Sequence, residues 1–536
     1  MTSPAAPVAR TAALALLLST GMSAAWAAVR WLQLRAGDLP DPDDLMRLQQ
    51  ILDWLNGQAF GDLTQHRMGP GGVAMHWSRL PDLIPAGMIR LLRPLIGGEG
   101  AERAMLILWP ALLFACFLWL AAMLGRRIGV RPVETMLVAL LAFPLTSLFA
   151  PGRIDHHGLQ IVLLLAAMLA LTGRATRVAG AVAALATVAT VVIGMETVPL
   201  FAVAIAVTLF RWCRDRREDA RVAGMALAMG PAALVAMAGF ATDSWSLPLC
   251  DGFTRQSWIA TLVGAVALAA LAIAEHRVVT PRNRLACVAA VATGAAIALL
   301  AWAPACRNPY GAVDPDLARL WLSKVGEAQN IVTADPRWTF SQTGLLVVAI
   351  IVGAYRSIRA PDRLRCLLLA VAIASLALAL FQLRGAYGGV AVGCVLLADA
   401  VMAARQRGVG AAVAMRLAAA GIIYPLLADA MPASDRPGDP ADCITPATRS
   451  ALAALPPSGV LAPIDLGPWL IRHGHRAMAA PYHRNAQGIL MTYRFAAADV
   501  PQRRTLLRDA DVQFVVGCDG RGLAPTGTPA LWRVRP

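Results

Sequence analysis

The sequence predicts a polytopic α-helical membrane protein with about thirteen transmembrane helices, followed by a small external α/β domain. Three observations support this fold class: 57% of the 536 residues are apolar, only 15% are charged, and arginine-rich segments recur between long apolar runs. This composition excludes an ordinary soluble enzyme. In a soluble protein the net charge of +15 would indicate a nucleic-acid partner, but here the arginines separate apolar runs, so no nucleic acid is expected.

A run of about 17 to 25 mostly apolar residues is long enough to cross the roughly 30 Å hydrocarbon core of a bilayer. Such runs follow one another through the first 430 residues. The predicted spans are approximately 11–29, 104–124, 133–150, 159–173, 178–195, 198–212, 222–242, 258–274, 285–303, 341–355, 366–383, 388–404 and 410–430. An alternative for the first run is a cleaved signal peptide, because Arg10 precedes it and Ala-rich sequence ends it.

The short arginine-rich connections set the orientation, because positively charged loops stay on the cytoplasmic side. If the amino terminus is inside, every even-numbered connection contains arginines. The predicted external segments are then 30–103, 151–158, 196–197, 243–257, 304–340, 384–387 and everything after about 431. We therefore expect a transmembrane domain over 1–430, with large external loops at 30–103 and 304–340, and an external domain over 431–536.

The composition changes in this last segment. Residues 432–446 are rich in Pro, Asp and Ser, as in a linker, and the apolar runs 459–462, 476–480 and 512–516 are typical of strands. External cysteines are present as Cys250 with Cys306 in loops and as Cys443 with Cys518 in the terminal domain. An oxidising exterior permits either pair to form a disulfide.

A polar turn at 151–160 interrupts two apolar runs and contains Arg153, Asp155, His156 and His157. Ionisable groups at the edge of hydrocarbon cost several kcal/mol unless they pair or bind a ligand. A carboxylate beside two imidazoles offers the oxygen and nitrogen ligands that Mn²⁺ and other divalent ions accept. The alternative is a local Asp155–Arg153 pair, with a histidine bonded to a carbonyl at the helix start.

Other acidic residues fall on the same predicted side of the membrane. The first external loop contains Asp38, Asp41, Asp43, Asp44 and Asp53, the third connection contains Glu196, and the loop 304–340 contains Glu327. Taken singly, Asp43 or Asp44 could cap a helix over 45–57, and Glu327 could be a solvated loop charge. Taken together, these residues predict one external acidic site.

The segment Arg153-Ile154-Asp155-His156-His157 between the third and fourth spans, the number of spans and the external terminal domain together resemble the catalytic subunit of oligosaccharyltransferase and its bacterial and archaeal single-subunit relatives. These are membrane glycosyltransferases of the C-type fold, and the chain looks like a divergent bacterial member. The resemblance covers most of the chain in topology and three short motifs in sequence.

The first motif is an acidic residue before an amphipathic helix in the first external loop, here Asp43 or Asp44, with the spacing favouring Asp43. The second is an acid, any residue and another acid; here His157 replaces the second acid after Asp155. The third is Ser-Val-Ser-Glu-His-Gln in eukaryotes, and this chain keeps Val, Glu and Gln in Lys324-Val325-Gly326-Glu327-Ala328-Gln329.

The resemblance implies a metal-dependent enzyme of the bacterial inner membrane with a periplasmic carboxyl-terminal domain. It would transfer a sugar or oligosaccharide from a polyprenyl-(di)phosphate donor to a protein, lipid or glycan acceptor at the outer face, surrounded by membrane lipid. Mn²⁺ or Mg²⁺ would be held by Asp43 or Asp44, Asp155 and His157, with Glu327 approaching from its loop. The catalytic residues would be those carboxylates: Asp43, Asp44, Asp155 and Glu327.

Arginines suit the phosphate of such a donor, because the guanidinium binds phosphate bidentately. Arg384 resembles the family's phosphate-contacting arginine, and Arg153 is a second candidate; the alternative for Arg384 is an arginine snorkelling to the interface. For the acceptor the candidates are Trp77, in a turn rich in glycine, and Asp465. Asp465-Leu466-Gly467 keeps the Asp and Gly of the family's Trp-Trp-Asp-Tyr-Gly motif without its aromatic residues, so sequon recognition is in doubt.

A transporter or flippase for lipid-linked sugars is the rival interpretation, in which the same external charges would bind without reacting. Transporters of this kind place ionisable residues near the midplane and show internal repeats. The sequence has no convincing repeat, and its charges cluster at one predicted interface. The pattern therefore favours the enzyme.

Overall fold

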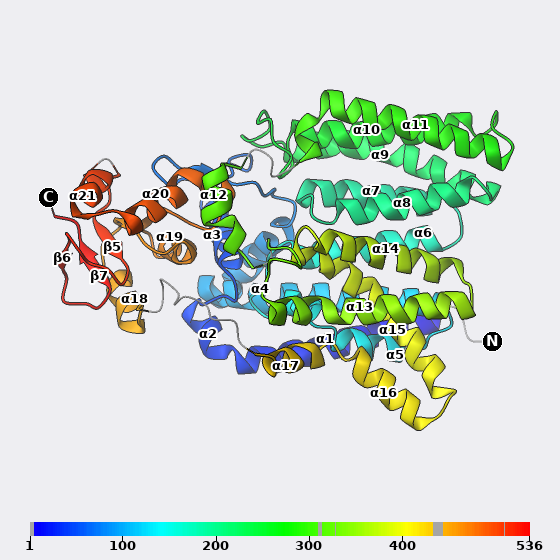
Figure 1. The fold of residues 1–536 in the computed structure, drawn as a ribbon, viewed down its shortest axis with the longest axis horizontal. Coiled ribbons are helices and arrows are strands. Elements are labelled where there is room, and N and C mark those ends of the chain that lie inside the picture. Colours follow the sequence, from blue (N-terminus) through cyan, green and yellow to red (C-terminus); the bar gives the residue numbers. More distant parts are fainter. Residues whose placement is uncertain (1–4, 309–312, 327, 433–442, 509, 536) are drawn as a thin grey trace.

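The computed structural model describes residues 5–308, 313–326, 328–432, 443–508 and 510–535. A bundle of long helices forms most of the protein, and a smaller α/β domain lies at one end of the bundle (Figure 1). The helical elements of the bundle and its loops are α1 Ala5–Val29, α2 Trp31–Ala36, α3 Pro42–Leu55, α4 Leu83–Arg127, α5 Pro132–Leu140, η1 Leu145–Phe149, α6 His157–Thr172, α7 Arg177–Ile193, α8 Val198–Trp212, η2 Arg216–Glu218, α9 Asp219–Phe240, α10 Arg255–Ala274, α11 Pro281–Trp302, η3 Pro304–Arg307, α12 Pro315–Leu320, η4 Leu322–Lys324, α13 Pro336–Arg359, α14 Arg363–Ala379, η5 Leu383–Gly385, α15 Ala386–Arg405, α16 Val409–Ala419 and α17 Ile423–Asp429.

Every predicted span overlaps a helix, but the helices differ in length. Within the described residues, seven helices are long and apolar enough to cross a membrane, or eight if the pair α16 and α17, bent by 72°, is one span. Helices α6, α7 and α8 are apolar but shorter, and the third predicted span is divided between α5 and η1. The structure is that of a multipass membrane protein, and the number thirteen stays a prediction.

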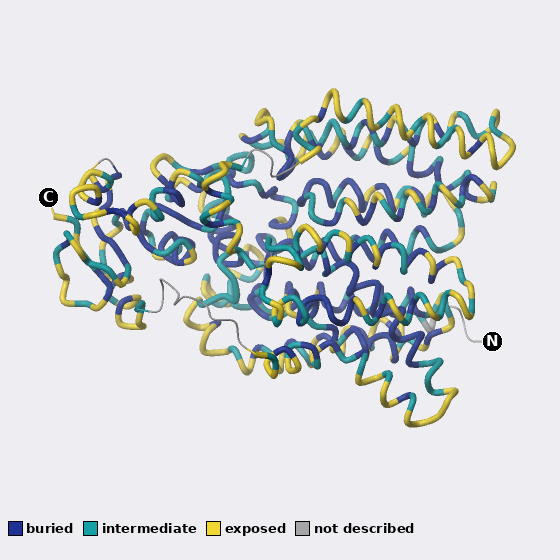
Figure 2. Tube along the Cα trace, viewed as in Figure 1, coloured by how far each residue is buried: buried dark blue, intermediate teal, exposed yellow. Residues whose placement is uncertain are grey.

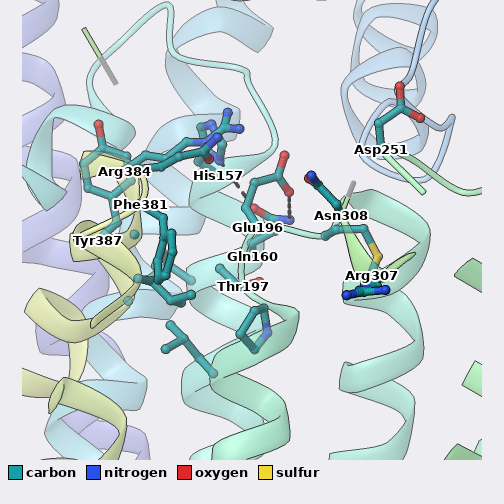
Figure 3. Close-up of a pocket in the computed structure, with 18 residues that line it drawn as sticks. His157, Gln160, Glu196, Thr197, Asp251, Arg307, Asn308, Phe381, Arg384 and Tyr387 are labelled. Carbon is teal, nitrogen blue, oxygen red and sulfur yellow. Dashed lines mark hydrogen bonds between the residues drawn. The ribbon is translucent and has the colours of Figure 1, made fainter. Parts of the chain in front are cut away.

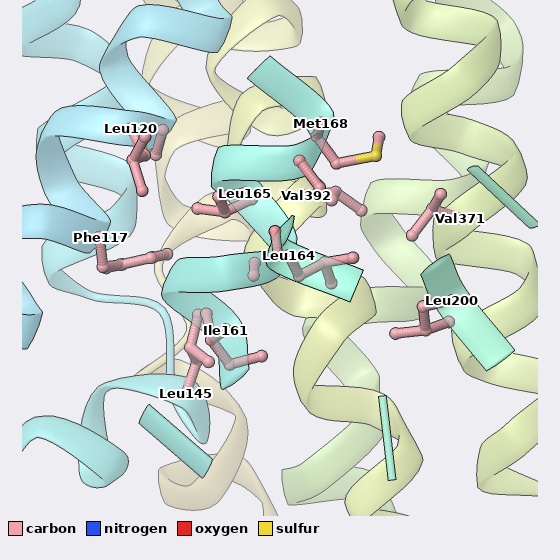
Figure 4. Close-up of a cluster of buried hydrophobic side chains, with 14 of the residues drawn as sticks. Phe117, Leu120, Leu145, Ile161, Leu164, Leu165, Met168, Leu200, Val371 and Val392 are labelled. Atoms are coloured by element: carbon pink, nitrogen blue, oxygen red, sulfur yellow. The ribbon is translucent and has the colours of Figure 1, made fainter. Parts of the chain in front are cut away.

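The bundle is held together by a continuous apolar core (Figure 4). Phe117 of α4, Leu164 of α6, Leu200 of α8, Val371 of α14 and Val392 of α15 are all buried in it. Helix α15 is buried over most of its apolar stretch, whereas no residue in the apolar window of α11 is buried (Figure 2). A helix that is apolar all round yet exposed in an isolated chain is suited to contact lipid.

The end of the bundle away from the α/β domain carries the arginine-rich connections. Their charges are paired with buried acids: Glu134 with Arg405 and Arg416, and Asp399 with Arg356 and Arg365. Ion pairs of this kind neutralise acids that the helices place near that end. The orientation of this end relative to the membrane stays a prediction.

The carboxyl-terminal segment folds as a small α/β domain. Its sheet has the strand order β4-β3-β5-β7-β6, in which β3 is parallel to both β4 and β5, and β7 is antiparallel to β5 and β6. The predicted strands correspond to β3, β4 and β5, and the Cys443–Cys518 disulfide crosslinks the domain. Its elements are α18 Pro446–Ala453, β3 Gly459–Leu461, η6 Ile464–Leu466, α19 Gly467–Arg472, β4 Arg476–Ala477, η7 His483–Asn485, α20 Ala486–Ala497, α21 Val500–Arg508, β5 Phe514–Val516, β6 Ala524–Pro525 and β7 Leu531–Arg533.

Several contacts dock this domain on the bundle, among them a backbone pairing and a buried ion pair. The first loop forms a small hairpin, β1 Thr64–Gln65 with β2 Val73–Ala74, and its tip exchanges backbone hydrogen bonds with Ala477 of β4. The loop before α10, which is crosslinked by the Cys250–Cys306 disulfide, places Asp251 against His483 and Arg484. The domain therefore covers the end of the bundle at which α6, α8 and α15 begin.

Candidate active site

A cavity of about 660 Å³ lies where α6, α8 and α15 begin (Figure 3). Its apolar wall includes Ile161, Leu200, Leu378 and Phe381. Polar groups also line it, from several elements: His157, Gln160, Glu196, Asp251, Arg307, Asn308, Arg384 and Tyr387. An apolar wall beside a cluster of charges suits a ligand that has both a hydrocarbon part and a charged headgroup.

The polar turn before α6 is shaped by Asp44 of the first loop. The fully buried Asp44 carboxylate accepts hydrogen bonds from the backbone N–H groups of Ile154 at 2.8 Å and Asp155 at 2.9 Å, and it lies 3.1 Å from Arg153 Nη1. Burial raises the pKa of Asp44 to about 7, although Arg153 lowers it. Because both oxygens serve the turn, Asp44 acts here as a support for Asp155.

Arg153 is held by acidic side chains outside the cavity. Its Nη1 also lies 2.9 Å from Asp41 Oδ2, while Asp41 Oδ1 accepts a hydrogen bond from the backbone of Asp43 as the N-cap of α3. Arg153 is not among the residues that line the cavity, which leaves Arg384 as the better placed phosphate ligand of the two predicted arginines. Asp41 was not among the predicted ligands; its position before a proline at a helix start was the available signal.

Asp43 and Asp44 face different partners although they are neighbours. Asp43 is half-buried, and burial together with the Asp43 carboxylate raises the pKa of Tyr482 well above its usual range. Tyr482 belongs to the α/β domain, so Asp43 faces the junction between that domain and α3. The roles of Asp43 and Asp44 as metal ligands stay predictions; the contacts that the structure shows for Asp44 are those with Arg153 and the backbone of the turn.

A buried arginine connects the turn to the rest of the first loop. Arg47 Nη1 lies 2.8 Å from Asp82 Oδ1, and its Nη2 lies 3.5 Å from Asp155 Oδ1. The guanidinium lies 4.4 Å from the ring centroid of Trp77, which packs edge-on against Tyr482. Trp77 is only 3% exposed, so it supports Arg47 and is not presented to an acceptor as the sequence suggested.

Asp155 has a different histidine at each oxygen. His156 Nδ1 lies 2.7 Å from Oδ1, and His157 Nε2 lies 3.3 Å from Oδ2. Burial raises the pKa of Asp155, but His156, His157 and Arg47 together hold that pKa well below its usual range. His156 Nε2 also lies 3.4 Å from Glu196, and although burial lowers the pKa of His156, Asp155 and Glu196 raise it to about 9. His156 thus lies between two carboxylates, and its Nδ1 is also 3.0 Å from Arg47 Nη2.

The residues of this turn fit a divalent cation. Asp155, His156 and His157 offer ligand atoms that lie within 4.8 Å of one another. His156 Nδ1 contacts Asp155 and Arg47, and its Nε2 contacts Glu196, which leaves Asp155 Oδ2 and His157 Nε2 as the better placed oxygen and nitrogen pair. A mixed pair of this kind is accepted by Mn²⁺ and Zn²⁺ more readily than by Mg²⁺, which prefers oxygen. The predicted ligand Glu327 lies outside the described residues.

The predicted acceptor residue Asp465 lies in η6 and is exposed. Burial and the Asp465 carboxylate raise the pKa of Tyr493, whose ring centroid is 5.2 Å from Lys324 Nζ. Lys324 ends η4 in the loop that carries the third predicted motif. Asp465 therefore belongs to the surface of the α/β domain nearest this motif.

The sequence analysis grouped Glu196 with the external acidic residues but gave no role to Glu196 or to Gln160. Glu196 lies between α7 and α8, and its Oε2 accepts a hydrogen bond from Gln160 Nε2 at 2.9 Å (Figure 3). Burial raises the pKa of Glu196, but the charges of His156 and Arg384 hold it well below its usual range. His156 in turn contacts Asp155. A lone Gln within an apolar helix start was the signal available for Gln160.

The fold resembles that of solved archaeal oligosaccharyltransferases. The chain superposes with AglB from Archaeoglobus fulgidus in complex with an inhibitory peptide and a dolichol-phosphate at a TM-score of 0.66 and 15% identity, covering 95% of this chain and 69% of that chain. The same oligosaccharyltransferase in complex with Zn and sulfate gives 0.61 and 15%, covering 94% and 67%. The form tethered to an acceptor peptide containing the NVT sequon gives 0.65 and 14%, covering 95% and 69%. No family model and no curated protein sequence matches this chain. The chain thus has an oligosaccharyltransferase-like fold.

Proposed function

We propose that this protein is a metal-dependent glycosyltransferase that moves a sugar or oligosaccharide from a polyprenyl-(di)phosphate donor to an acceptor at the outer face of the bacterial inner membrane. One observation carries the proposal: three features lie together. They are the Asp155–His157 ligand pair, the cavity with an apolar wall, and Arg384, which lines that cavity. The oligosaccharyltransferase-like fold supports it, since a solved neighbour binds a dolichol-phosphate.

The donor would lie with its hydrocarbon along Ile161, Leu378 and Phe381 and its phosphate beside Arg384. As the bond to the sugar breaks, negative charge grows on the phosphate oxygens, and the Arg384 guanidinium stabilises that charge. A divalent cation, when bound, would supply further neutralisation of the phosphate charge. Asp155 and His157 would hold that cation, and Asp44 and Arg47 hold Asp155 in place.

The acceptor must lose a proton as it attacks the sugar. A carboxylate near the attacking atom can take that proton, and Asp43, at the junction with the α/β domain, and Glu327 are the candidates. The acceptor would enter between the bundle and the α/β domain, where Asp465 is exposed. A protein is favoured as acceptor, since a neighbouring structure holds a peptide with an NVT sequon, and a lipid or glycan is the alternative.

The test is transfer from a radiolabelled polyprenyl-diphosphate sugar by the purified protein with Mn²⁺ or Mg²⁺. Asp155→Asn should reduce transfer by roughly 100-fold or more, and Arg384→Gln by a similar factor. Asp316→Asn, which changes an exposed acid of α12, is the matched control and should leave transfer unchanged. Transfer retained in Asp155→Asn would contradict the proposal, and lipid translocation without transfer in the wild type would establish the flippase instead.

A further inference from the structure

Five side chains around the cation position form a closed ring of polar contacts. Asp155 contacts His156 and His157, His156 contacts Glu196, Glu196 contacts Gln160, and Gln160 contacts His157. All five come from two short segments, the start of α6 and the turn between α7 and α8. All members of the ring but Glu196 are buried, and His157, Gln160 and Glu196 line the cavity.

The orientation of the Gln160 amide is fixed by its surroundings. Gln160 Nε2 donates to Glu196 Oε2 at 2.9 Å and to the carbonyl oxygen of Gly194 at 3.3 Å, and neither a carboxylate nor a carbonyl can donate in return. Gln160 Oε1 therefore faces the other way, 3.4 Å from His157 Nδ1. Because Oε1 can only accept, the hydrogen of this contact belongs to His157 Nδ1.

This assignment decides which nitrogen of His157 would bind a metal. With a hydrogen on Nδ1, the ligating lone pair of a neutral imidazole is on Nε2, which lies 3.3 Å from Asp155 Oδ2. A divalent cation held by His157 would therefore be bound through Nε2, on the side of Asp155. Partners that fix the tautomer of a ligating histidine in this way commonly strengthen metal binding.

We infer that Gln160 and Glu196 are positioning residues that hold His157 with its Nε2 directed at a divalent cation shared with Asp155; this inference rests on the proposed metal-dependent function. Gln160 orients the imidazole directly, and Glu196 holds the Gln160 amide. Gly194 is part of the arrangement, because a Cβ added there would collide with the Glu196 carboxylate. The residue before the turn must therefore be small for Glu196 to reach Gln160.

The experiment is isothermal titration of Mn²⁺ alone into the purified full-length protein in detergent. Gln160→Leu and Gly194→Ala should each raise the Kd for Mn²⁺ by about 10- to 100-fold. Gln160→Glu keeps an acceptor for His157 Nδ1 but loses the N–H groups that bond Glu196 and Gly194, so it should recover only part of the affinity. Gln50→Leu, at a buried glutamine of α3 bonded to the Leu63 carbonyl, is the matched control and should leave the Kd unchanged.

Transfer assays distinguish positioning from a general loss of folding. In Gln160→Leu the Mn²⁺ concentration for half-maximal transfer should rise while the rate at saturating Mn²⁺ stays near the wild-type rate. If the wild type binds Mn²⁺, and Asp155→Asn abolishes binding, but Gln160→Leu and Gly194→Ala bind with unchanged Kd, the inference is wrong and the proposed function stands. If the wild type transfers sugar without binding any divalent cation, the metal dependence and this inference both fail.

Discussion

The carboxylate of Asp44 accepts a hydrogen bond from the backbone N–H of Asp155 at 2.9 Å, across a sequence separation of 111 residues. This contact joins the start of α3 in the first loop to the turn that precedes α6. Since Asp155 also faces His157, the geometry of the proposed cation site depends on the position of Asp44.

Replacing Asp44 by a residue without a side-chain oxygen should therefore destabilise the protein more than replacing it by the uncharged Asn. Asp44→Ala leaves two buried backbone N–H groups without an acceptor, which costs roughly 1 to 3 kcal/mol each. Asp44→Asn keeps an oxygen that can accept both bonds and should lose less. Thermal unfolding in detergent measures the difference, and equal losses in the two variants would contradict the structural role of Asp44.

Arg47 should be among the residues that the fold tolerates least when changed. Its pair with Asp82 is fully buried, and removing one partner of such a pair costs about 3 to 5 kcal/mol. We expect Arg47→Met to lower the unfolding temperature strongly, by leaving the Asp82 carboxylate buried with less compensation. Arg103→Met, which breaks an exposed pair with Glu99, should cost about 1 kcal/mol or less in the same assay.

The junction of the α/β domain with the bundle should weaken in acid because of His76. The His76 ring centroid lies 4.9 Å from that of His483. Burial and the charges of His483 and Arg484 lower the pKa of His76 well below its usual value. Asp251 and Glu196 act in the opposite direction, but their effect is smaller. The unfolded chain gains a proton at His76 near pH 6.5, whereas the folded protein does so only at lower pH. The contribution of His76 to the free energy of unfolding is thus fully present above about pH 6.5. It is lost as the pH falls below that value, because the unfolded chain then binds the proton and the folded protein does not.

The measurement is the unfolding temperature at pH 7.5 and at pH 5.5 for the wild type and His76→Gln. We expect the wild type to lose more stability than the variant over this interval, with a slope of up to about 1.4 kcal/mol per pH unit for one proton. The comparison with the variant is needed because His156, whose pKa is raised to about 9, contributes in the opposite direction. An identical loss in both proteins would exclude His76 as the source.

The proposed orientation can be tested with cysteines at the two ends of the molecule. Cys366 is an exposed free cysteine at the arginine-rich end, and Arg504 is exposed on α21 of the α/β domain. In spheroplasts a membrane-impermeant maleimide should label Arg504→Cys and leave Cys366 unlabelled, whereas inverted vesicles should give the opposite pattern. Labelling of both positions from the same side would contradict the predicted topology.

Several features of the fold could be predicted because they depend on local sequence. Apolar runs such as 388–404 locate helices directly, and the pairs Cys250–Cys306 and Cys443–Cys518, permitted by their external positions, are both disulfides. The turn around Asp155 could be recognised because ionisable residues are costly between apolar runs. Its meeting with the first loop was expected from the resemblance, and Asp44 confirms the contact.

Other features of the site depend on contacts between distant segments. Asp41, Asp43 and Asp44 are nearly equivalent in sequence, but α3 turns them toward Arg153, Tyr482 and the backbone of Asp155 respectively. Trp77 looked available to a ligand because its neighbours are turn residues, yet Arg47 and Tyr482 enclose it. No local pattern reports such packing.

The sequence by itself determined where the chain is apolar enough to form helices, which connections are basic, and which turn concentrates ionisable groups, because each of these properties belongs to a short stretch of residues. The tertiary structure decided which carboxylates support the turn before α6 and which face the proposed cation site. It alone brings Glu196 to Gln160 and Gln160 to His157. The reason is that a side chain's chemical role is set by its partners, and here the partners come from other helices.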